Sequence, residues 1–206
     1  MVNITKRVFG EEHPYRLFSI VNLAVIYQMQ GQWKEAKELE VMVMEMTKRV
    51  LGDEHPHMLT SILNLASTYQ NQGWWKEAEN LQMRVMEMRK SVLGEDHPST
   101  LTSMAHLSLT YCYQGQWKEA EELQVMVMDT RKRVLSNEHP DSLRSIASLA
   151  LTFGNQGRWK EAEKLEVMVM ETRMRLLGEE HPDTLASVGN LASTYLLRVR
   201  TSCESP

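Results

Sequence analysis

The amino-acid sequence predicts an all-α protein, a right-handed superhelical solenoid of antiparallel helix pairs. Two motifs recur along its 206 residues, each time with a spacing of 42 residues. His-Pro occurs at 13–14, 55–56, 97–98, 139–140 and 181–182, and Gly-x-Trp-Lys-Glu-Ala begins at Gly31, Gly73, Gly115 and Gly157. Repeat periods of about 20 to 50 residues are typical of solenoids, whose units bury their apolar faces by stacking on one another.

The first helix of each unit is expected to follow His-Pro, because proline is favoured at the first helical position. In the second unit Leu59, Ile62, Ala66 and Tyr69 recur at steps of three and four residues. This spacing places them on one face of a helix. Gly73 then ends the helix.

The second helix of that unit is predicted to begin near Trp75, with Ala78, Leu81 and Val85 on its apolar stripe. Acidic residues lie in its first turn and basic residues near its end, which complements the helix dipole. Glycine follows most of the second helices as a stop signal. Ser136 replaces it at one equivalent position, so a slightly strained turn is expected there.

The repeats divide the chain into one predicted repeat domain, residues 1–200, with a tail at 201–206. Residues 2–10 align with 44–52, which indicates a partial helix at 1–10 and an array cut at both ends. The complete repeats are expected at about 13–52, 55–94, 97–136 and 139–178, followed by a terminal helix at about 182–200 that acts as a cap.

Composition excludes several classes of function. Charged residues make up 24% of the chain, the net charge is -4 and no basic block occurs, so nucleic acid is not an expected partner. No apolar run is long enough to span a bilayer, and the N-terminus does not resemble a signal peptide. The two cysteines, Cys112 and Cys203, do not form a disulfide framework. This favours a reducing compartment, and we expect a cytoplasmic protein.

The repeated residues resemble the tetratricopeptide repeat, whose pattern Leu65, Ala66, Tyr69, Gly73 and Ala78 match in the second unit. The 42-residue period, the acidic pair before His-Pro and Asn-Leu-Ala in the first helix are similar to the kinesin light chain subtype. The closeness of the copies also resembles the repeat tails of fungal nucleotide-binding, immune-receptor-like proteins, although no phosphate-binding loop is present.

The resemblance implies that the first helices line a concave surface on which an extended peptide binds. One position, often an asparagine that hydrogen-bonds a peptide backbone in the family, is filled here by Asn22, Asn64, His106, Ser148 and Asn190. The other polar groove positions are Thr60, Thr102, Arg144, Ser67, Gln28, Gln70, Asn71, Tyr113 and Asn155, and the apolar ones are Phe18, Val25, Met29, Leu109 and Leu151. A solvated site or a hydrogen bond between repeats is the alternative role for the asparagines.

Other candidate sites are interpreted as structural. The five histidines before proline are expected to shape the helix starts, because equivalent points of neighbouring units lie too far apart to share a metal. Trp33, Trp75, Trp117 and Trp159 are expected in the packing between helices, and most of the methionines in the core. Trp74 occupies a variable position, so it is expected to be exposed and available to a partner.

These observations predict a protein-interaction scaffold that needs no cofactor or metal. The alternative is a structural spacer or self-associating array within a larger receptor-like or adaptor protein. An enzyme is not expected. His106 and Cys112 lie six residues apart on one helix and do not face each other, and repeated residues do not form the unique constellation that catalysis requires.

Overall fold

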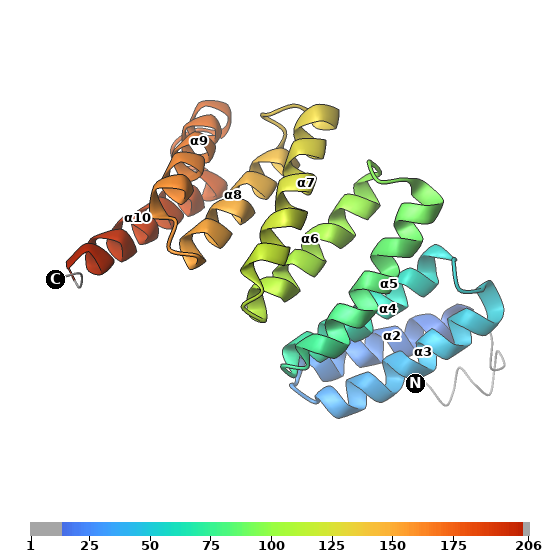
Figure 1. Ribbon diagram of the computed structural model, residues 1–206. Helices are drawn as coiled ribbons and strands as arrows, with labels where there is room; N and C mark the ends of the chain where they lie inside the picture. Colours follow the sequence, from blue (N-terminus) through green and yellow to red (C-terminus); the bar gives the residue numbers. More distant parts are fainter. Residues whose placement is uncertain (1–13, 204–206) are drawn as a thin grey trace. The chain divides into compact units, whose positions relative to one another are not determined.

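The structure, a computed structural model, describes residues 14–203 of the chain and the side chains of residues 15–200 (Figure 1). This part contains nine α-helices and no strand. The first helices of the repeats are α2 (Pro14–Met29), α4 (Pro56–Asn71), α6 (Pro98–Tyr113), α8 (Pro140–Asn155) and α10 (Pro182–Cys203). The second helices are α3 (Trp33–Leu51), α5 (Trp75–Leu93), α7 (Trp117–Leu135) and α9 (Trp159–Leu177).

The predicted helix starts are confirmed: each first helix begins at the proline of His-Pro, and each second helix begins at the tryptophan. The last helix extends to Cys203, three residues beyond the end predicted for it, so part of the predicted tail is helical. The predicted partial helix at 1–10 and His13 lie outside the described residues.

The histidines cap the first helices, as the sequence predicted. The Nδ1 atom of His139 accepts a hydrogen bond from the backbone N–H of Asp141 at 3.2 Å. His55, His97 and His181 accept the same bond from the residue two positions on, at 3.1 to 3.2 Å. The bond satisfies one of the amide groups that the first turn of a helix leaves without a partner.

Residue contacts group the chain into two compact units, residues 1–103 and 104–206. In the first unit α2 packs on α3, α3 on α4, and α4 on α5. Its core consists of two clusters, one around Ile20, Val43 and Met46 and one around Met58, Ile62 and Val85. The core therefore lies along the seam between first and second helices.

The second unit repeats this packing through α7, α8, α9 and α10. Leu143, Ile146 and Val169 form one cluster, and Leu149, Phe153 and Ala162 form another. The tryptophans that begin the second helices are half-buried, in agreement with a packing role. Several methionines, such as Met58 and Met104, are fully buried, whereas Met29 is highly exposed, so the core prediction holds for only part of this set.

Arginines near the ends of α5, α7 and α9 join these helices to the first helix of the following repeat. Nη1 of Arg89 donates to the carbonyl oxygen of Ser99 at 3.1 Å and to Ser103 Oγ at 2.8 Å. Equivalent bonds run from Arg131 to the Asp141 carbonyl and from Arg173 to the Asp183 carbonyl and Ser187 Oγ. The sequence analysis had related these basic residues only to the helix dipole.

Candidate functional site

An open groove in the first unit lies between α2, the end of α3 and the start of α4. Its volume is about 580 Å³, within the range typical of ligand-binding clefts. The groove is lined by Leu17, Phe18, Val21, Val43, Thr47, Val50, Leu51, His55, His57, Thr60, Ser61 and Asn64. It brings together three positions predicted from the sequence to contact a peptide: Phe18, Thr60 and Asn64.

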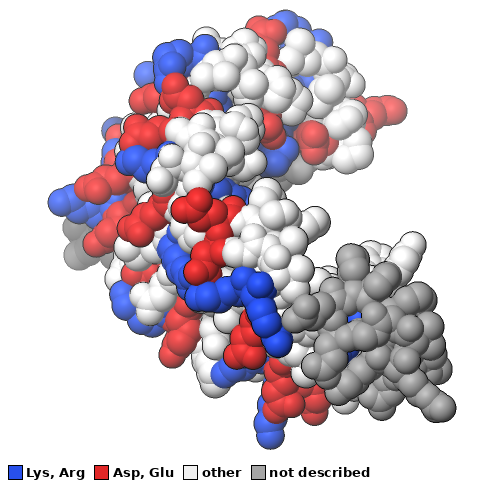
Figure 2. Space-filling model, turned by 90° about the vertical axis from the view of Figure 1, so that its right-hand side faces the viewer, with Lys and Arg blue, Asp and Glu red and all other residues white. Residues whose placement is uncertain are grey.

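The first helices beside this groove, α2 and α4, carry almost no charge. Arg16, which is buried, is the one Lys, Arg, Asp or Glu in α2 and α4 together. The second helices of the same unit, by contrast, carry both signs of charge along their length. Figure 2 shows acidic and basic side chains interspersed on one face of the molecule. The first helices of this unit thus present neutral polar and apolar side chains to solvent.

Most of the predicted peptide-contacting residues in the first unit reach the surface. Phe18 is 66% exposed, and Asn22, Thr60, Ser67 and Asn71 are also exposed. Asn64, Gln70 and Thr102 are half-buried, and the hydroxyl of Thr102 donates to the Pro98 carbonyl of its own helix. Asn22 and Asn64 stand at equivalent points of α2 and α4.

In the second unit the predicted peptide-contacting positions vary more in residue type and in exposure. His106, Tyr113 and Asn155 are exposed, and Asn190 is half-buried. The Ser148 hydroxyl donates to the Arg144 carbonyl at 3.0 Å, and Arg144 itself forms an exposed ion pair with Asp141 at 2.8 Å. The row of asparagines is therefore interrupted at α6 and α8.

Gln28 is engaged within the protein. Its Nε2 atom donates to Glu40 Oε1 and to Thr68 Oγ1, both at 2.7 Å, and Thr68 Oγ1 donates to Glu40 Oε1 at 3.0 Å. These three residues come from α2, α3 and α4, so the network fastens two repeats together. The amide nitrogen of Gln28 is therefore engaged in a contact between repeats.

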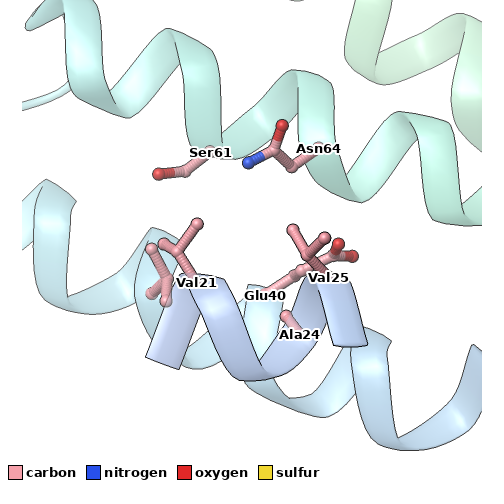
Figure 3. Close-up of a pocket in the computed structure, with 7 residues that line it drawn as sticks. Val21, Ala24, Val25, Glu40, Ser61 and Asn64 are labelled. Atoms are coloured by element: carbon pink, nitrogen blue, oxygen red, sulfur yellow. The ribbon is translucent and has the colours of Figure 1, made fainter. Parts of the chain in front are cut away.

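Glu40 also lines a small cavity between α2 and α4 (Figure 3). Its volume of about 10 Å³ corresponds to roughly one water molecule. In the close-up, Ser61 and Asn64 on α4 face Val21 and Val25 on α2. Glu40 is buried, and its Oε2 atom has no hydrogen-bond partner among the described residues. Burial raises the pKa of the Glu40 carboxyl to about 7, against the lowering effect of the bonds from Thr68 and Gln28.

Related contacts occur in the second unit. Thr194 Oγ1 donates to Glu166 Oε1 at 3.0 Å, and burial raises the pKa of this carboxyl too. Cys112 replaces the glutamine, with its Sγ atom 3.4 Å from Thr152 Oγ1 and 3.9 Å from Gln124 Nε2. Burial raises the pKa of the Cys112 thiol, which disfavours the reactive thiolate. The sequence analysis missed this network, although threonine recurs at 68, 110, 152 and 194.

Trp74 is 45% exposed, as the sequence predicted. Its ring stacks on that of Tyr69 with centroids 5.6 Å apart, and Lys37 Nζ lies 4.6 Å from the Trp74 centroid. In the second unit Arg158 takes the place of Trp74 and lies over Phe153, while it also pairs with Glu121 and Glu161. These contacts support the helix junctions, and Trp74 stays partly exposed to solvent.

Among residues 14–203 no group of three or more His, Cys, Asp or Glu side chains is arranged to hold a metal ion. No helix in the same range combines the length and apolar character needed to cross a membrane.

Comparisons with known proteins agree with the architecture. Sequence models of the tetratricopeptide repeat match residues 19–57, 57–133 and 106–173. The fold resembles the nearly identical TPR-like repeats of a Podospora anserina protein assigned as a kinesin light chain. That match has a TM-score of 0.79 and 37% identity, and it covers 92% of this chain and 90% of the other. A variant of the same repeats matches with a TM-score of 0.80 and 36% identity over the same shares.

A more distant structure is BtubC (BKLC) from P. vanneervenii, with a TM-score of 0.77 and 17% identity. The match covers 95% of this chain and 79% of that one, and it supports the fold alone. No curated protein matches the sequence.

Proposed function

The chain belongs to the tetratricopeptide repeat family, whose domains are generally protein-interaction modules, and from this premise we propose that it binds an extended peptide of a partner protein. The binding surface is formed by the first helices of the repeats. One observation carries the proposal: the open groove of the first unit runs beside a neutral surface that includes Phe18 and Asn64.

The chemistry of this surface suits a peptide backbone. An asparagine side chain offers two donors and an acceptor, so it can bind both the N–H and the C=O groups of an extended chain. Asn22 is exposed and Asn64 is half-buried at the edge of the groove. The apolar walls provide the remaining contact area, since ligand clefts are mostly apolar with a few placed polar groups.

The test uses peptides selected from a random display library against the intact chain. Affinity for a selected peptide is measured by fluorescence polarisation with wild type and with the Asn22→Ala, Asn64→Ala double variant. We expect roughly thirtyfold weaker binding, because each of the two amides provides hydrogen bonds worth about 1 kcal/mol.

The control is Asn80→Ala, which removes an exposed asparagine from α5 in the same unit. It should bind the peptide as wild type does. Unchanged affinity in a correctly folded double variant, or a failure to select any peptide, would contradict the proposal.

We propose that the chain acts without catalysis. The free thiol of Cys112 is held by Thr152 and Gln124, and its raised pKa disfavours nucleophilic attack at neutral pH. Iodoacetamide labelling of Cys112 at pH 7 should be much slower than that of a free cysteine, and rapid labelling would contradict this reasoning.

We also propose a cytoplasmic location, because the thiol of Cys112 is free, as is usual in a reducing compartment. Cell fractionation of the tagged chain tests it. Recovery in a membrane or secreted fraction would contradict it.

A second candidate function is self-association through α10. Leu185 and Val188 are 57% and 42% exposed, whereas Leu59 and Ile62, at the equivalent points of α4, are 7% and 0% exposed. In α4 these side chains pack with Val85 of α5, whereas in α10 they remain exposed. An uncovered apolar stripe of this kind favours association with another surface.

Sedimentation across a concentration range tests this second candidate. Wild type should form dimers or larger species, and the Leu185→Ser, Val188→Ser double variant should remain monomeric. A wild-type chain that is monomeric at all concentrations would contradict it.

A further inference from the structure

The arginine that joins successive repeats is missing from the first one that the structure describes. Arg89, Arg131 and Arg173 each donate from the end of a second helix to a carbonyl oxygen in the first turn of the next helix. Thr47 occupies the equivalent position of α3. Its short side chain ends at a hydroxyl and cannot span the same distance.

The acceptors for that arginine are nevertheless present. The carbonyl oxygen of His57 corresponds to those of Ser99, Asp141 and Asp183, and Ser61 corresponds to Ser103 and Ser187. Ser61 Oγ donates to the His57 carbonyl at 2.9 Å. Ser103 and Ser187 make the same bond while they also accept from an arginine, because a carbonyl and a hydroxyl oxygen each have two lone pairs.

The residues that would surround this arginine border the open groove, although Thr47 and Ser61 are themselves buried. Thr47, His57 and Ser61 all line this groove, whose volume is about 580 Å³. Leu17, Val21 and Val43 provide apolar walls, which can pack against the methylene stem of a long side chain. Since the groove is open to solvent beside Phe18, a side chain of another molecule can enter it.

An arginine can occupy such a site without a carboxylate partner. Arg89 does so: it donates to the Ser99 carbonyl and the Ser103 hydroxyl, and burial lowers its pKa. A guanidinium stays charged under these conditions and presents several donors in a fixed plane. A lysine ammonium is more strongly hydrated and reaches fewer acceptors at once, so the site favours arginine.

We propose that this socket, formed by Thr47, the His57 carbonyl and the Ser61 hydroxyl, receives an arginine side chain of the bound peptide. The inference rests on the proposed peptide-binding function and specifies its ligand. A partner arginine then completes, from outside, the contact that the later repeats make within the chain. The first repeat is therefore specific for a peptide arginine, whereas the repeats with their own arginine are not.

The primary test does not require a known partner. N-acetyl-L-arginine methylamide is titrated into the isotopically labelled intact chain, and amide shifts are followed by NMR. We expect saturable binding, with shifts that cluster at the C-terminal end of α3 and the start of α4. The corresponding norleucine and lysine derivatives should bind roughly tenfold more weakly. Norleucine has no charged donor, and a lysine ammonium reaches fewer of the acceptors.

Two variants locate the site. Thr47→Arg supplies the missing guanidinium from within and should abolish binding of the arginine derivative. Ser61→Ala removes one acceptor with little change of shape and should weaken binding severalfold, which keeps the test decisive if Thr47→Arg does not fold. Asn80→Arg, which adds the same charge on the exposed side of α5, should bind as wild type does.

Three results would overturn the socket: no saturable binding of the arginine derivative, equal binding of the norleucine derivative, or undiminished binding in both Thr47→Arg and Ser61→Ala.

Selected peptides separate this inference from the proposed function. If they depend on Asn22 and Asn64 but tolerate replacement of every arginine by norleucine, peptide binding stands and the socket is overturned. If no peptide is selected although the arginine derivative binds, the peptide-binding function is overturned and the socket is a site for a free guanidinium group.

Discussion

Glu40 Oε1 accepts a hydrogen bond from Thr68 Oγ1 at 3.0 Å, and Glu166 accepts the same bond from Thr194 three repeats later. Each bond joins the middle of a second helix to the first helix of the following repeat. Because the carboxylates are buried, this contact between repeats also makes stability depend on pH.

Replacement of Glu40 by glutamine should remove part of that dependence. The folded-state pKa of about 7 lies above the ordinary value of 4.5, so the folded chain retains a proton that the unfolded chain has lost. The contribution of this carboxyl to the free energy of unfolding is therefore complete below about pH 4.5, and it is lost as the pH rises through 7.

At pH 8 Glu40→Gln should be more stable than wild type by on the order of 2 kcal/mol, and at pH 4.5 the difference should nearly vanish. Gln82 and Gln124 already occupy this position in other repeats. Urea denaturation at the two pH values measures the effect, with Glu38→Gln on the exposed side of the same helix as the control. An identical pH dependence in wild type and Glu40→Gln would refute the assignment.

Replacement of Ser136 by glycine should stabilise the protein. Ser136 has φ of 102° and ψ of 162° at the end of α7, where Gly52, Gly94 and Gly178 end the other second helices. A side chain in this region costs about 1 kcal/mol or more. Ser136→Gly should raise the free energy of unfolding by about 1 kcal/mol.

The reciprocal change Gly94→Ser should lower it by a similar amount, because a Cβ atom there meets nothing within 4 Å and only backbone strain remains. Thermal and urea denaturation of both variants test the pair. A neutral result in both would show that the turn is not strained.

Loss of a histidine cap should loosen the start of a helix. His139→Ala removes the acceptor for the Asp141 amide and should cost about 1 kcal/mol. His139→Asn keeps a side-chain acceptor and should cost less. Hydrogen exchange at the first amides of α8 measures the local effect, and equal protection in all three proteins would contradict the capping role.

The arginine contact between repeats should contribute more to the free energy of unfolding than a surface ion pair does. Arg89→Met keeps the apolar stem but loses the bonds to Ser99 and Ser103, and it should cost about 1.5 kcal/mol. Lys90→Met removes an exposed pair with Glu95 and should cost less than about 0.5 kcal/mol. Urea denaturation compares them, and equal losses would argue against a joining role for Arg89.

Much of the fold could be predicted because its signals are local. Proline at the first helical position, glycine after the last and apolar residues at steps of three and four act within a few residues. The starts of α4 at Pro56 and α5 at Trp75 were therefore predicted correctly. The exposure of Trp74 followed from its place outside the repeating pattern.

The polar contacts between repeats could not be predicted in the same way. Gln28, Glu40 and Thr68 lie 12 and 28 residues apart, and only the stacking of α2, α3 and α4 brings them together. None of these three residues looks unusual in the sequence. The sequence predicts only a peptide contact for Gln28, and the hydrogen bonds of its amide to Glu40 and Thr68 are seen only in the structure.

The sequence by itself determined the repeat, its helix boundaries and the positions at which the copies differ, because these depend on local backbone and side-chain preferences. The tertiary structure decided what those differences mean. Thr47 is an ordinary substitution in the sequence. It becomes the wall of a socket only because α3 and α4 hold it opposite the His57 carbonyl and Ser61, where the other repeats place a guanidinium group.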